Sequence, residues 1–431
     1  MINEESLLAL SQAQWTPHFK RPLYEDYAFS CLVSTISKLL TGEGENPLSP
    51  QAVGGSYKRY DCVVLFLIDG FGWSFFETYR HQYPALQRFV EKGVASQISS
   101  EFPSTTAAHL TTLHTGQEVG QTGIYEWFQY EPLVDEMVAP VLVSYAGDYD
   151  VGRLVKEGYP LEALFPFETV YQKLAKKGVR SLVFQQDKIA NSAYSKALLA
   201  GAEVIPFGPF SEVLDLIVQR LHQPCEEPTY LFIYFGEIDA VGHRQGITSP
   251  QFEEAMRACW SAVEERLWKK LEHLPNRTAL LFTADHGMTA VDPKTTILLN
   301  RLCPELPNRI KKNKRGELLI PAGSCRDFFL HIEEEFLHQT QRELQEKLHG
   351  VADVVFTQEL LEKGFFGSKP VSQRLKERIG NLVVLPYKGE NVFWHFEKHR
   401  FEQHFYGAHG GLTAEEMESI FLFADLSERG I

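Results

Sequence analysis

Short apolar runs alternate along the chain with longer segments in which apolar residues recur at the spacing of a helix. The runs that end in glycine, aspartate or a polar turn are 62–68, 181–184, 230–235, 279–283 and 381–385. The segment 250–274 shows the other pattern, since Phe252, Met256 and Cys259 fall on one helical stripe. Uninterrupted apolar runs are typical of strands buried on both faces, and strands that alternate with helices form parallel sheets. The pattern predicts an α/β fold, a doubly wound and mainly parallel sheet with helices on both faces.

The stretch between about residues 292 and 380 breaks this alternation. It contains a basic turn at 311–316, a mostly apolar run at 328–332 and a charged helical segment at 339–349. The basic turn is most simply a solvated loop, because charge runs usually lie in solvent. We therefore expect an inserted α+β cap subdomain in this stretch. The expected division is a core at 1–291 and 381–431 and a cap at 292–380.

The chain is acidic, with 42 Lys and Arg against 56 Asp and Glu and a formal net charge of −14. An acidic surface disfavours binding to nucleic acid and to anionic membranes, since both require positive charge. No apolar run is long enough to cross a bilayer. The six cysteines are scattered without a Cys-x-x-Cys pair, and the N-terminal segment is acidic, unlike a secretion signal. These features predict a cytoplasmic protein that binds neither nucleic acid nor membrane.

Two of the apolar runs lead into aspartate. Asp69 follows the run 62–68 and precedes Gly70, and Asp285 with His286 follows the run 279–283. In open parallel sheets, ligands bind at the carboxyl ends of the strands, so these side chains are candidates for one site. The alternative for Asp69-Gly70 is an ordinary turn. An Asp-His pair in a turn at a strand end is less common by chance, and both side chains can converge on one ion.

Two further segments carry candidate metal ligands. Asp239 and His243 are four residues apart after the run 230–235, so both can meet on one face of a helical turn. An ordinary polar helix start is the alternative for this segment. His409 lies in the loop Gly407-Ala-His-Gly-Gly, where the glycines suit a ligand held in a tight turn.

A candidate nucleophile lies in the segment Phe102-Pro-Ser-Thr-Thr106. The residues after it, up to Gly116, can form a helix for which a Ser or Thr is a good N-cap. An ordinary capped helix is therefore one interpretation. In the other, Thr106 places a hydroxyl at the helix N-terminus, where the dipole and free N–H groups favour an alkoxide and a bound phosphoryl group.

Taken in order, these five segments resemble the alkaline phosphatase superfamily, in particular its nucleotide pyrophosphatase/phosphodiesterase branch. The resemblance implies an alkaline-phosphatase-like fold with two zinc ions at the carboxyl edge of the sheet. It implies that one zinc is held by Asp239, His243 and His409, and the other by Asp69, Asp285 and His286, with Thr106 as nucleophile and ligand of the latter. Thr105 is the less favoured candidate for the nucleophile. Oxygen and nitrogen ligands of this kind suit zinc, and other divalent ions are compatible.

The expected reaction has two steps. Thr106 attacks phosphorus and forms a phospho-threonine intermediate, which water then hydrolyses. The expected substrate is a small-molecule phosphate ester, with nucleotides among the candidates. Members of this branch usually carry Asn about twenty residues after the nucleophile, whereas this chain reads Gly123-Ile-Tyr-Glu-Trp127. Tyr125, Glu126 and Trp127 are therefore the expected substrate contacts, and ordinary packing is the alternative for the aromatic residues.

Other functions stay open at this point. A phosphomonoesterase usually needs an added Arg or Lys near the phosphate, and none lies between Gly93 and Gly152. A diester is therefore the expected substrate class, although Arg153 and Arg244 are candidates to supply the positive charge that a monoester would need. A phosphonate hydrolase of the same superfamily is another alternative. A non-catalytic scaffold would lack at least one metal ligand or the nucleophile. In this chain all six candidate ligands and Thr106 are present. The sequence indicates no oligomeric state.

Overall fold

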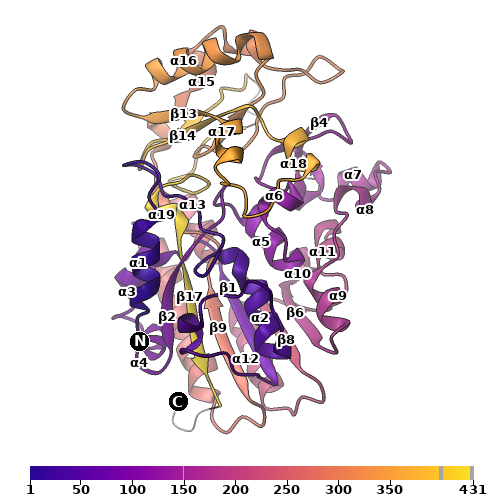
Figure 1. The fold of residues 1–431 in the computed structure, drawn as a ribbon, viewed down its shortest axis with the longest axis vertical. Helices are drawn as coiled ribbons and strands as arrows, with labels where there is room; N and C mark the ends of the chain where they lie inside the picture. Colours follow the sequence, from indigo (N-terminus) through magenta and orange to yellow (C-terminus); the bar gives the residue numbers. More distant parts are fainter. Residues whose placement is uncertain (149, 398–400, 428–431) are drawn as a thin grey trace.

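The computed structural model describes residues 1–148, 150–397 and 401–427. Its centre is a seven-stranded sheet with the order β2-β17-β9-β1-β8-β6-β7 (Figure 1). The strands of this sheet are β1 Cys62–Ile68, β2 Val94–Ser99, β6 Arg180–Gln186, β7 Glu203–Phe207, β8 Thr229–Phe235, β9 Thr278–Thr283 and β17 Glu418–Asp425. Only β17 runs antiparallel to its neighbours β2 and β9 in this sheet, and the other neighbouring pairs are parallel. The expected mainly parallel α/β fold is confirmed.

The central strand β1 shows why an uninterrupted apolar run forms this sheet. All seven of its residues are buried. Val64, Phe66 and Ile68 join the apolar cluster on one face, and Val63, Leu65 and Leu67 join the cluster on the other. Since successive side chains of a strand point to opposite faces, a strand covered on both sides must be apolar at every position. Full burial of each large side chain contributes about 1.5–3 kcal/mol.

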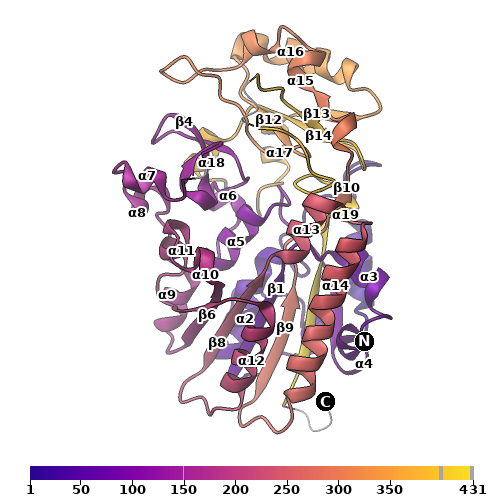
Figure 2. The ribbon, with the colours of Figure 1, turned by 180° about the vertical axis from the view of Figure 1, so that it is seen from behind.

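Helices cover both faces of the sheet, as the two opposite views show (Figures 1 and 2). One face carries α3 Trp73–Tyr79, α4 Pro84–Lys92, α12 Phe210–Leu221 and α14 Pro250–Ala262. The other face carries α2 Leu32–Thr41, α5 Thr106–Thr115 and α9 Val170–Ala175. The helical pattern at 250–274 is confirmed for α14, which continues into a π-helical turn at Val263–Leu267. The remaining α-helices are α1 Glu4–Gln12, α6 Val119–Thr122, α7 Arg153–Lys156, α8 Leu161–Leu164, α10 Asp187–Ala190, α11 Ala193–Leu198, α13 Glu237–Gln245, α15 Leu299–Leu302, α16 Leu337–Lys347, α17 Thr357–Glu362, α18 Gln373–Arg378 and α19 Ala414–Met417.

A second, smaller sheet lies beyond one end of the central sheet, together with the helices α15 to α18. It is antiparallel, with the order β12-β14-β13, and its strands are β12 Phe328–Leu330, β13 Ala352–Phe356 and β14 Leu382–Pro386. The apolar run 381–385, assigned above to the core, thus forms the middle strand of the cap sheet. The correction has a physical reason: a strand buried on both faces has the same pattern in either sheet, and only pairing distinguishes them. The cap sheet therefore includes residues beyond 380, while the division into separate domains stays a prediction.

Three small sheets complete the fold. Two are two-stranded, namely β10 Thr289–Ala290 with β16 Gly407–Ala408 and β11 Ile297–Leu298 with β15 Val392–Phe393. The third contains β3 Gln129–Glu131, β4 Glu136–Ala139 and β5 Ser144–Tyr145. The basic turn 311–316 contacts this third sheet, since Arg315 forms an ion pair with Glu136 and Asn313 donates to the same carboxylate at 3.2 Å. The turn is exposed at Lys312, Lys314 and Arg315, as expected of a solvated loop, and these contacts also connect it to β4. Among the described residues, no helix is both long and apolar enough to span a membrane.

Candidate active site

The ends of three adjacent strands bring the candidate ligands together. Strand β1 lies between β8 and β9, and Asp69 directly follows β1. Asp285 and His286 lie just after β9, and the helix α13, which carries Asp239 and His243, follows β8. His409 follows β16, whose pairing with β10 holds the loop beside the end of β9. Parallel strands share one carboxyl edge, so residues far apart in sequence meet there.

The first group consists of Asp69, Asp285 and His286, with Thr106 beside them. His286 Nε2 lies 3.3 Å from Asp285 Oδ2 and 3.6 Å from Asp69 Oδ1. Thr106 Oγ1 lies 3.2 Å from His286 Nε2 and 3.4 Å from each oxygen of Asp69. The two carboxylates and the imidazole are buried. These distances place one hydroxyl and three metal-ligating side chains around one point.

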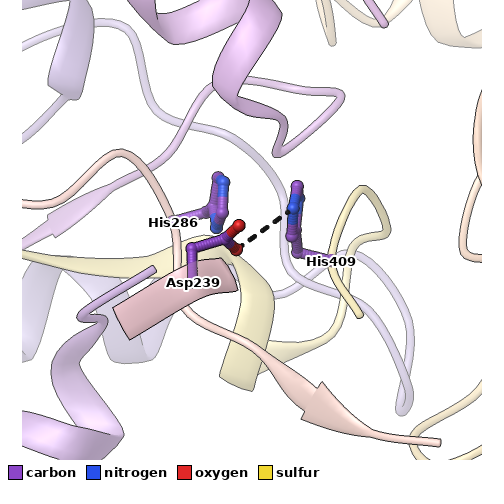
Figure 3. Close-up of side chains that lie close together, drawn as sticks. All are labelled: Asp239, His286 and His409. Carbon is purple, nitrogen blue, oxygen red and sulfur yellow. Dashed lines mark ion pairs between the residues drawn. The ribbon is translucent and has the colours of Figure 1, made fainter. Parts of the chain in front are cut away.

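The second group consists of Asp239, His243 and His409. Asp239 Oδ1 lies 3.4 Å from His243 Nε2 and 3.5 Å from His409 Nε2, and the two Nε2 atoms are 3.1 Å apart. The rings of His286 and His409 are stacked with their centroids 3.6 Å apart, so the two groups are contiguous. Figure 3 shows Asp239, His286 and His409 at this junction. All six side chains identified from the sequence are thus brought together.

Hydrogen bonds to main-chain carbonyls orient the three imidazoles. His243 Nδ1 lies 2.7 Å from the oxygen of Gly407, His286 Nδ1 lies 3.0 Å from that of Gly287, and His409 Nδ1 lies 2.9 Å from that of Ser104. A carbonyl oxygen only accepts, so each Nδ1 carries the proton. Each Nε2 is then an unprotonated acceptor directed at the centre, which is the tautomer required of a metal ligand.

The donor atoms fit divalent cations. Within the described residues, Asp239 Oδ1 and Asp285 Oδ2 are buried without a hydrogen-bond partner. Burial, with repulsion from Asp285 and Asp239, raises the pKa of Asp69 well above its usual range. Burial also raises the pKa of Asp239 to about 6 and lowers the pKa of His286 and His409 well below the usual value. Three buried carboxylates facing neutral imidazoles repel one another and need positive charge, which two divalent ions would supply.

Helix α5 places Thr106 at the site. Its N-cap is Thr105, whose buried hydroxyl accepts from the N–H of Ala108 and donates to the carbonyl of Tyr125 at 3.0 Å. Thr106 is the first residue of the helix, and its hydroxyl faces Asp69 and His286. The expected helix end at Gly116 is confirmed by a left-handed C-cap with φ of 67°. The structure therefore favours Thr106 over Thr105, since the hydroxyl of Thr105 serves as the cap.

Sequence reasoning did not identify Ser104, which joins the nucleophile loop to the loop of His409. Its hydroxyl donates to the carbonyl of Gly411 at 2.8 Å and accepts from the N–H of Gly410 at 3.1 Å. Its own N–H donates to the carbonyl of Gly410 at 3.3 Å, and its carbonyl accepts from His409. No local signal identifies this role, because every partner lies about three hundred residues away in sequence.

The expected substrate contacts have different environments. Tyr125 is fully buried, with its ring packed against Phe329 at a centroid distance of 5.1 Å. Glu126 is also buried, accepts from the N–H of Trp127 and lies near the carboxyl of Asp327, which acts on its pKa. This burial corrects the expectation for Tyr125 and Glu126, since both side chains fill the joint between core and cap and neither is accessible. Trp127 is 40% exposed and stays a candidate.

The two arginines considered above, Arg153 and Arg244, are engaged with acidic side chains near the surface. Arg153 forms exposed ion pairs with Asp148 and Glu157, and Arg244 pairs with Glu237 at the surface. In the part of the chain that the structure describes, no Lys or Arg forms a hydrogen bond or ion pair with the six ligands or with Thr106. Bound divalent ions would supply positive charge at this centre.

Comparison with known proteins agrees with this geometry. The chain aligns with human ectonucleotide pyrophosphatase/phosphodiesterase family member 7 at 39% identity over 97 residues, which cover 22% of this chain and 20% of that relative. The fold is similar to that of murine ectonucleotide pyrophosphatase/phosphodiesterase 5, with a TM-score of 0.60, 19% identity, and coverage of 84% of this chain and 87% of the other. An inactive threonine-to-alanine variant of that murine protein in complex with AMP gives a TM-score of 0.61 at 19% identity and the same coverage.

The family model that describes the type I phosphodiesterase/nucleotide pyrophosphatase family matches residues 63–412. This range begins in strand β1 and ends just after the loop of His409, so it includes every candidate ligand and Thr106. The match covers most of the chain, and the protein therefore belongs to the type I phosphodiesterase/nucleotide pyrophosphatase family.

Proposed function

We propose that this protein is a metal-dependent hydrolase of phosphodiester or pyrophosphate bonds in small molecules, with Thr106 as its nucleophile. The observation that carries the proposal is the position of the Thr106 hydroxyl. It lies at the N-terminus of α5, within 3.2–3.4 Å of His286 Nε2 and of both oxygens of Asp69. A hydroxyl held against a metal-ligating group is the arrangement that activates a weak nucleophile.

Two divalent ions, for which we propose zinc, would be held by the two groups of ligands. Asp69, Asp285 and His286 would hold one ion, and Asp239, His243 and His409 would hold the other. When bound, such ions supply Lewis acidity that lowers the pKa of a hydroxyl or water and offsets negative charge on the phosphoryl oxygens.

The residues of the chain perform the rest of the reaction. The Thr106 oxygen forms a bond to phosphorus while the bond from phosphorus to the leaving group breaks, which releases an alcohol or nucleotide. The phospho-threonine that forms keeps the second organic group of the substrate on its phosphorus, and hydrolysis later releases this group as a phosphate monoester. The hydroxyl proton leaves with the departing group or to solvent. Water then attacks the same phosphorus and restores the free hydroxyl. The N-terminus of α5 favours the bound phosphoryl group through its dipole, and Thr105 keeps the first turn in place through its cap.

Among the described residues, no Lys or Arg is paired with the candidate ligands or Thr106, which supports a diester or pyrophosphate over a monoester. A monoester carries an additional negative charge and is usually bound by Arg or Lys as well. Here Arg153 and Arg244 are engaged at the surface with acidic neighbours. Nucleotide-containing substrates are candidates, since the murine relative forms a complex with AMP. Trp127 would contact the organic part of the substrate.

We also propose a reducing, cytoplasmic location, which the six unpaired cysteines support.

A comparison of substrates tests this proposal. The zinc-loaded protein is assayed with p-nitrophenyl phosphate and with a p-nitrophenyl diester, which share one leaving group. We expect the kcat/KM for the diester to exceed that for the monoester by at least about tenfold, because the site offers no side chain for the extra charge. A clear preference for the monoester would replace this function by a phosphomonoesterase, and cleavage of a phosphonate monoester alone would indicate a phosphonate hydrolase. Lack of both metal binding and hydrolysis would indicate a scaffold.

A further inference from the structure

Tyr234 at the end of β8 makes a short hydrogen bond to Asp69. In the sheet register Tyr234 lies beside Leu67, so its side chain reaches the start of the loop after β1. The Tyr234 hydroxyl donates to Asp69 Oδ2 at 2.5 Å. A phenol that donates to a metal-ligating carboxylate fixes the orientation of that carboxylate and the electron density on its oxygens.

We propose that Tyr234 is a positioning residue that holds Asp69 so that Oδ1, and not Oδ2, faces the cation bound with Asp285 and His286. The inference rests on the proposed function. Asp69 Oδ1 is the oxygen that lies 3.6 Å from His286 Nε2, whereas Oδ2 is the oxygen engaged by the phenol. Thr106 Oγ1 is 3.4 Å from both oxygens, so rotation of the carboxylate would also disturb the nucleophile.

Burial makes this hydrogen bond difficult to replace. The side chain of Asp69 is only 2% exposed. Solvent therefore has little access to Oδ2, and loss of the phenol would leave this buried oxygen with only the longer contact, 3.4 Å, from Thr106 Oγ1. An unsatisfied buried oxygen either draws the ion toward itself or rotates the carboxylate, and either change alters the geometry of the ligand set.

Gly236 provides the space that the Tyr234 hydroxyl occupies. A Cβ at Gly236 would lie 2.7 Å from the hydroxyl oxygen and 3.0 Å from Cζ of the ring. The φ of Gly236 is −103°, which any residue adopts, so the constraint here is space and not backbone conformation. Gly236 is also the N-cap of α13, which carries Asp239 and His243. The phenol therefore lies between Asp69 of one ligand group and the start of the helix that bears the other.

The chain offers a matched control for the loss of this hydrogen bond. The Tyr79 hydroxyl donates to Glu253 Oε1, also at 2.5 Å, and joins helices α3 and α14. Tyr79 is buried and contacts none of the six ligands through its hydroxyl. Tyr79→Phe and Tyr234→Phe thus remove the same chemical interaction, one away from the site and one within it.

The experiment measures zinc binding by isothermal titration of the metal-free protein, together with the kcat and KM for a p-nitrophenyl diester. For Tyr234→Phe we expect one of the two zinc ions to bind roughly 10- to 100-fold more weakly, with a fall in kcat and little change in KM under saturating zinc. Tyr79→Phe should bind both ions and turn over like the unchanged protein, although it loses a similar amount of thermal stability. Wild-type zinc affinity and kcat in Tyr234→Phe would overturn the inference.

A second pair of variants tests the spatial part of the inference. Gly236→Ala should weaken zinc binding by a similar factor, because the added methyl displaces the phenol. In the Tyr234→Phe background the same alanine should have a smaller effect, since the hydrogen bond that it would break is already lost and only the 3.0 Å contact with the ring Cζ remains. Additive effects of the two changes would overturn the proposed role of Gly236. Failure of the unchanged protein to bind zinc or to cleave any phosphate ester would instead overturn the proposed function.

Discussion

His409 donates the hydrogen of Nδ1 to the main-chain carbonyl of Ser104 at 2.9 Å, across 305 positions of sequence. Ser104 lies two residues before Thr106, so one short segment holds both a metal ligand and the proposed nucleophile. The Ser104 hydroxyl strengthens the connection through its bonds to Gly410 and Gly411. The distance between the nucleophile and the second ligand group is therefore set by a link between two loops and not by either loop alone.

This link predicts that Ser104→Ala lowers catalysis more than stability alone explains. Loss of one donor and one acceptor in a buried site should cost about 1–3 kcal/mol of unfolding free energy. Because the loop of His409 loses its anchor, we also expect kcat/KM for a diester to fall roughly 10- to 100-fold. Ser6→Ala is the control, since the Ser6 hydroxyl is equally buried, donates to the carbonyl of Asn3 and accepts from the N–H of Gln97. Equal kinetics for the two variants would contradict the prediction.

The nucleophile has its own test. Thr106→Ala should reduce turnover of a diester by at least about 10³-fold, because no other hydroxyl among the described residues lies against both Asp69 and His286. Zinc content should stay near that of the unchanged protein, since the six charged and imidazole ligands are intact. Thr106→Ser keeps a hydroxyl and should retain a measurable fraction of the activity. Substantial turnover by the alanine variant, measured with metal loaded, would exclude a phospho-threonine intermediate.

Removal of metal should destabilise the fold. The carboxylates of Asp69 and Asp285, which are buried, and of Asp239, which is partly buried, repel one another without cations. Binding of cations to the folded state alone adds stability by mass action. Zinc at about a thousand times its dissociation constant would add about 4 kcal/mol. Differential scanning calorimetry with a chelator should therefore give a lower unfolding temperature, which added zinc restores. An unfolding temperature that is independent of zinc would contradict the presence of a metal centre.

A buried carboxyl pair should make stability depend on pH. Burial and the neighbouring Glu126 raise the pKa of Asp327 well above its usual range, and burial raises the pKa of Glu126 to about 7. Since a raised pKa means that the folded state binds more protons than the unfolded chain, the contribution to stability is complete below about pH 4 and is lost as pH rises through 7 and above. We therefore expect Asp327 and Glu126 to share one proton at neutral pH.

Asp327→Asn tests this pair, because the amide donates permanently to Glu126 and carries no charge. We expect the variant to unfold roughly 2–4 °C above the unchanged protein at pH 9 and to lose the advantage near pH 5. Asp353→Asn is a control, since that carboxylate accepts from the Tyr387 hydroxyl and lies on the cap strand β13, away from the pair. A difference between wild type and Asp327→Asn that does not change with pH would show that the pair does not share a proton.

Trp127 is the remaining candidate for a substrate contact. Its indole is 40% exposed, and its neighbours Tyr125 and Glu126 are buried. If the ring stacks on an aromatic or heterocyclic leaving group, Trp127→Ala should raise KM roughly 10-fold with little change in kcat. Leu133→Ala, another exposed apolar residue, is the control. An unchanged KM for both aryl and nucleotide diesters would remove Trp127 from the site.

The local pattern of the sequence was sufficient for the chemical centre. Asp69 and Asp285 come just after buried strands, and Asp239 and His243 lie on the helix that follows another strand, so their place at the carboxyl edge follows from the strand pattern. His409 was indicated by its glycine neighbours and by the family resemblance, and the structure brings it to 3.1 Å from His243. These positions are readable because metal and nucleophile chemistry admit few residue types.

The strand pairing, hydrogen bonds and burial around the candidate ligands were decided by the tertiary structure alone. The strand β14 pairs within the cap sheet. Ser104 is hydrogen-bonded to His409, and Tyr234 is hydrogen-bonded to Asp69. Tyr125 and Glu126 are buried beside the cap sheet. Each outcome depends on which segments pair across hundreds of residues. An apolar strand has the same pattern in any sheet, and a serine or tyrosine hydroxyl has many equivalent acceptors. The residues of the sequence therefore determined what chemistry the site can perform, whereas long-range packing determined how rigidly it is held.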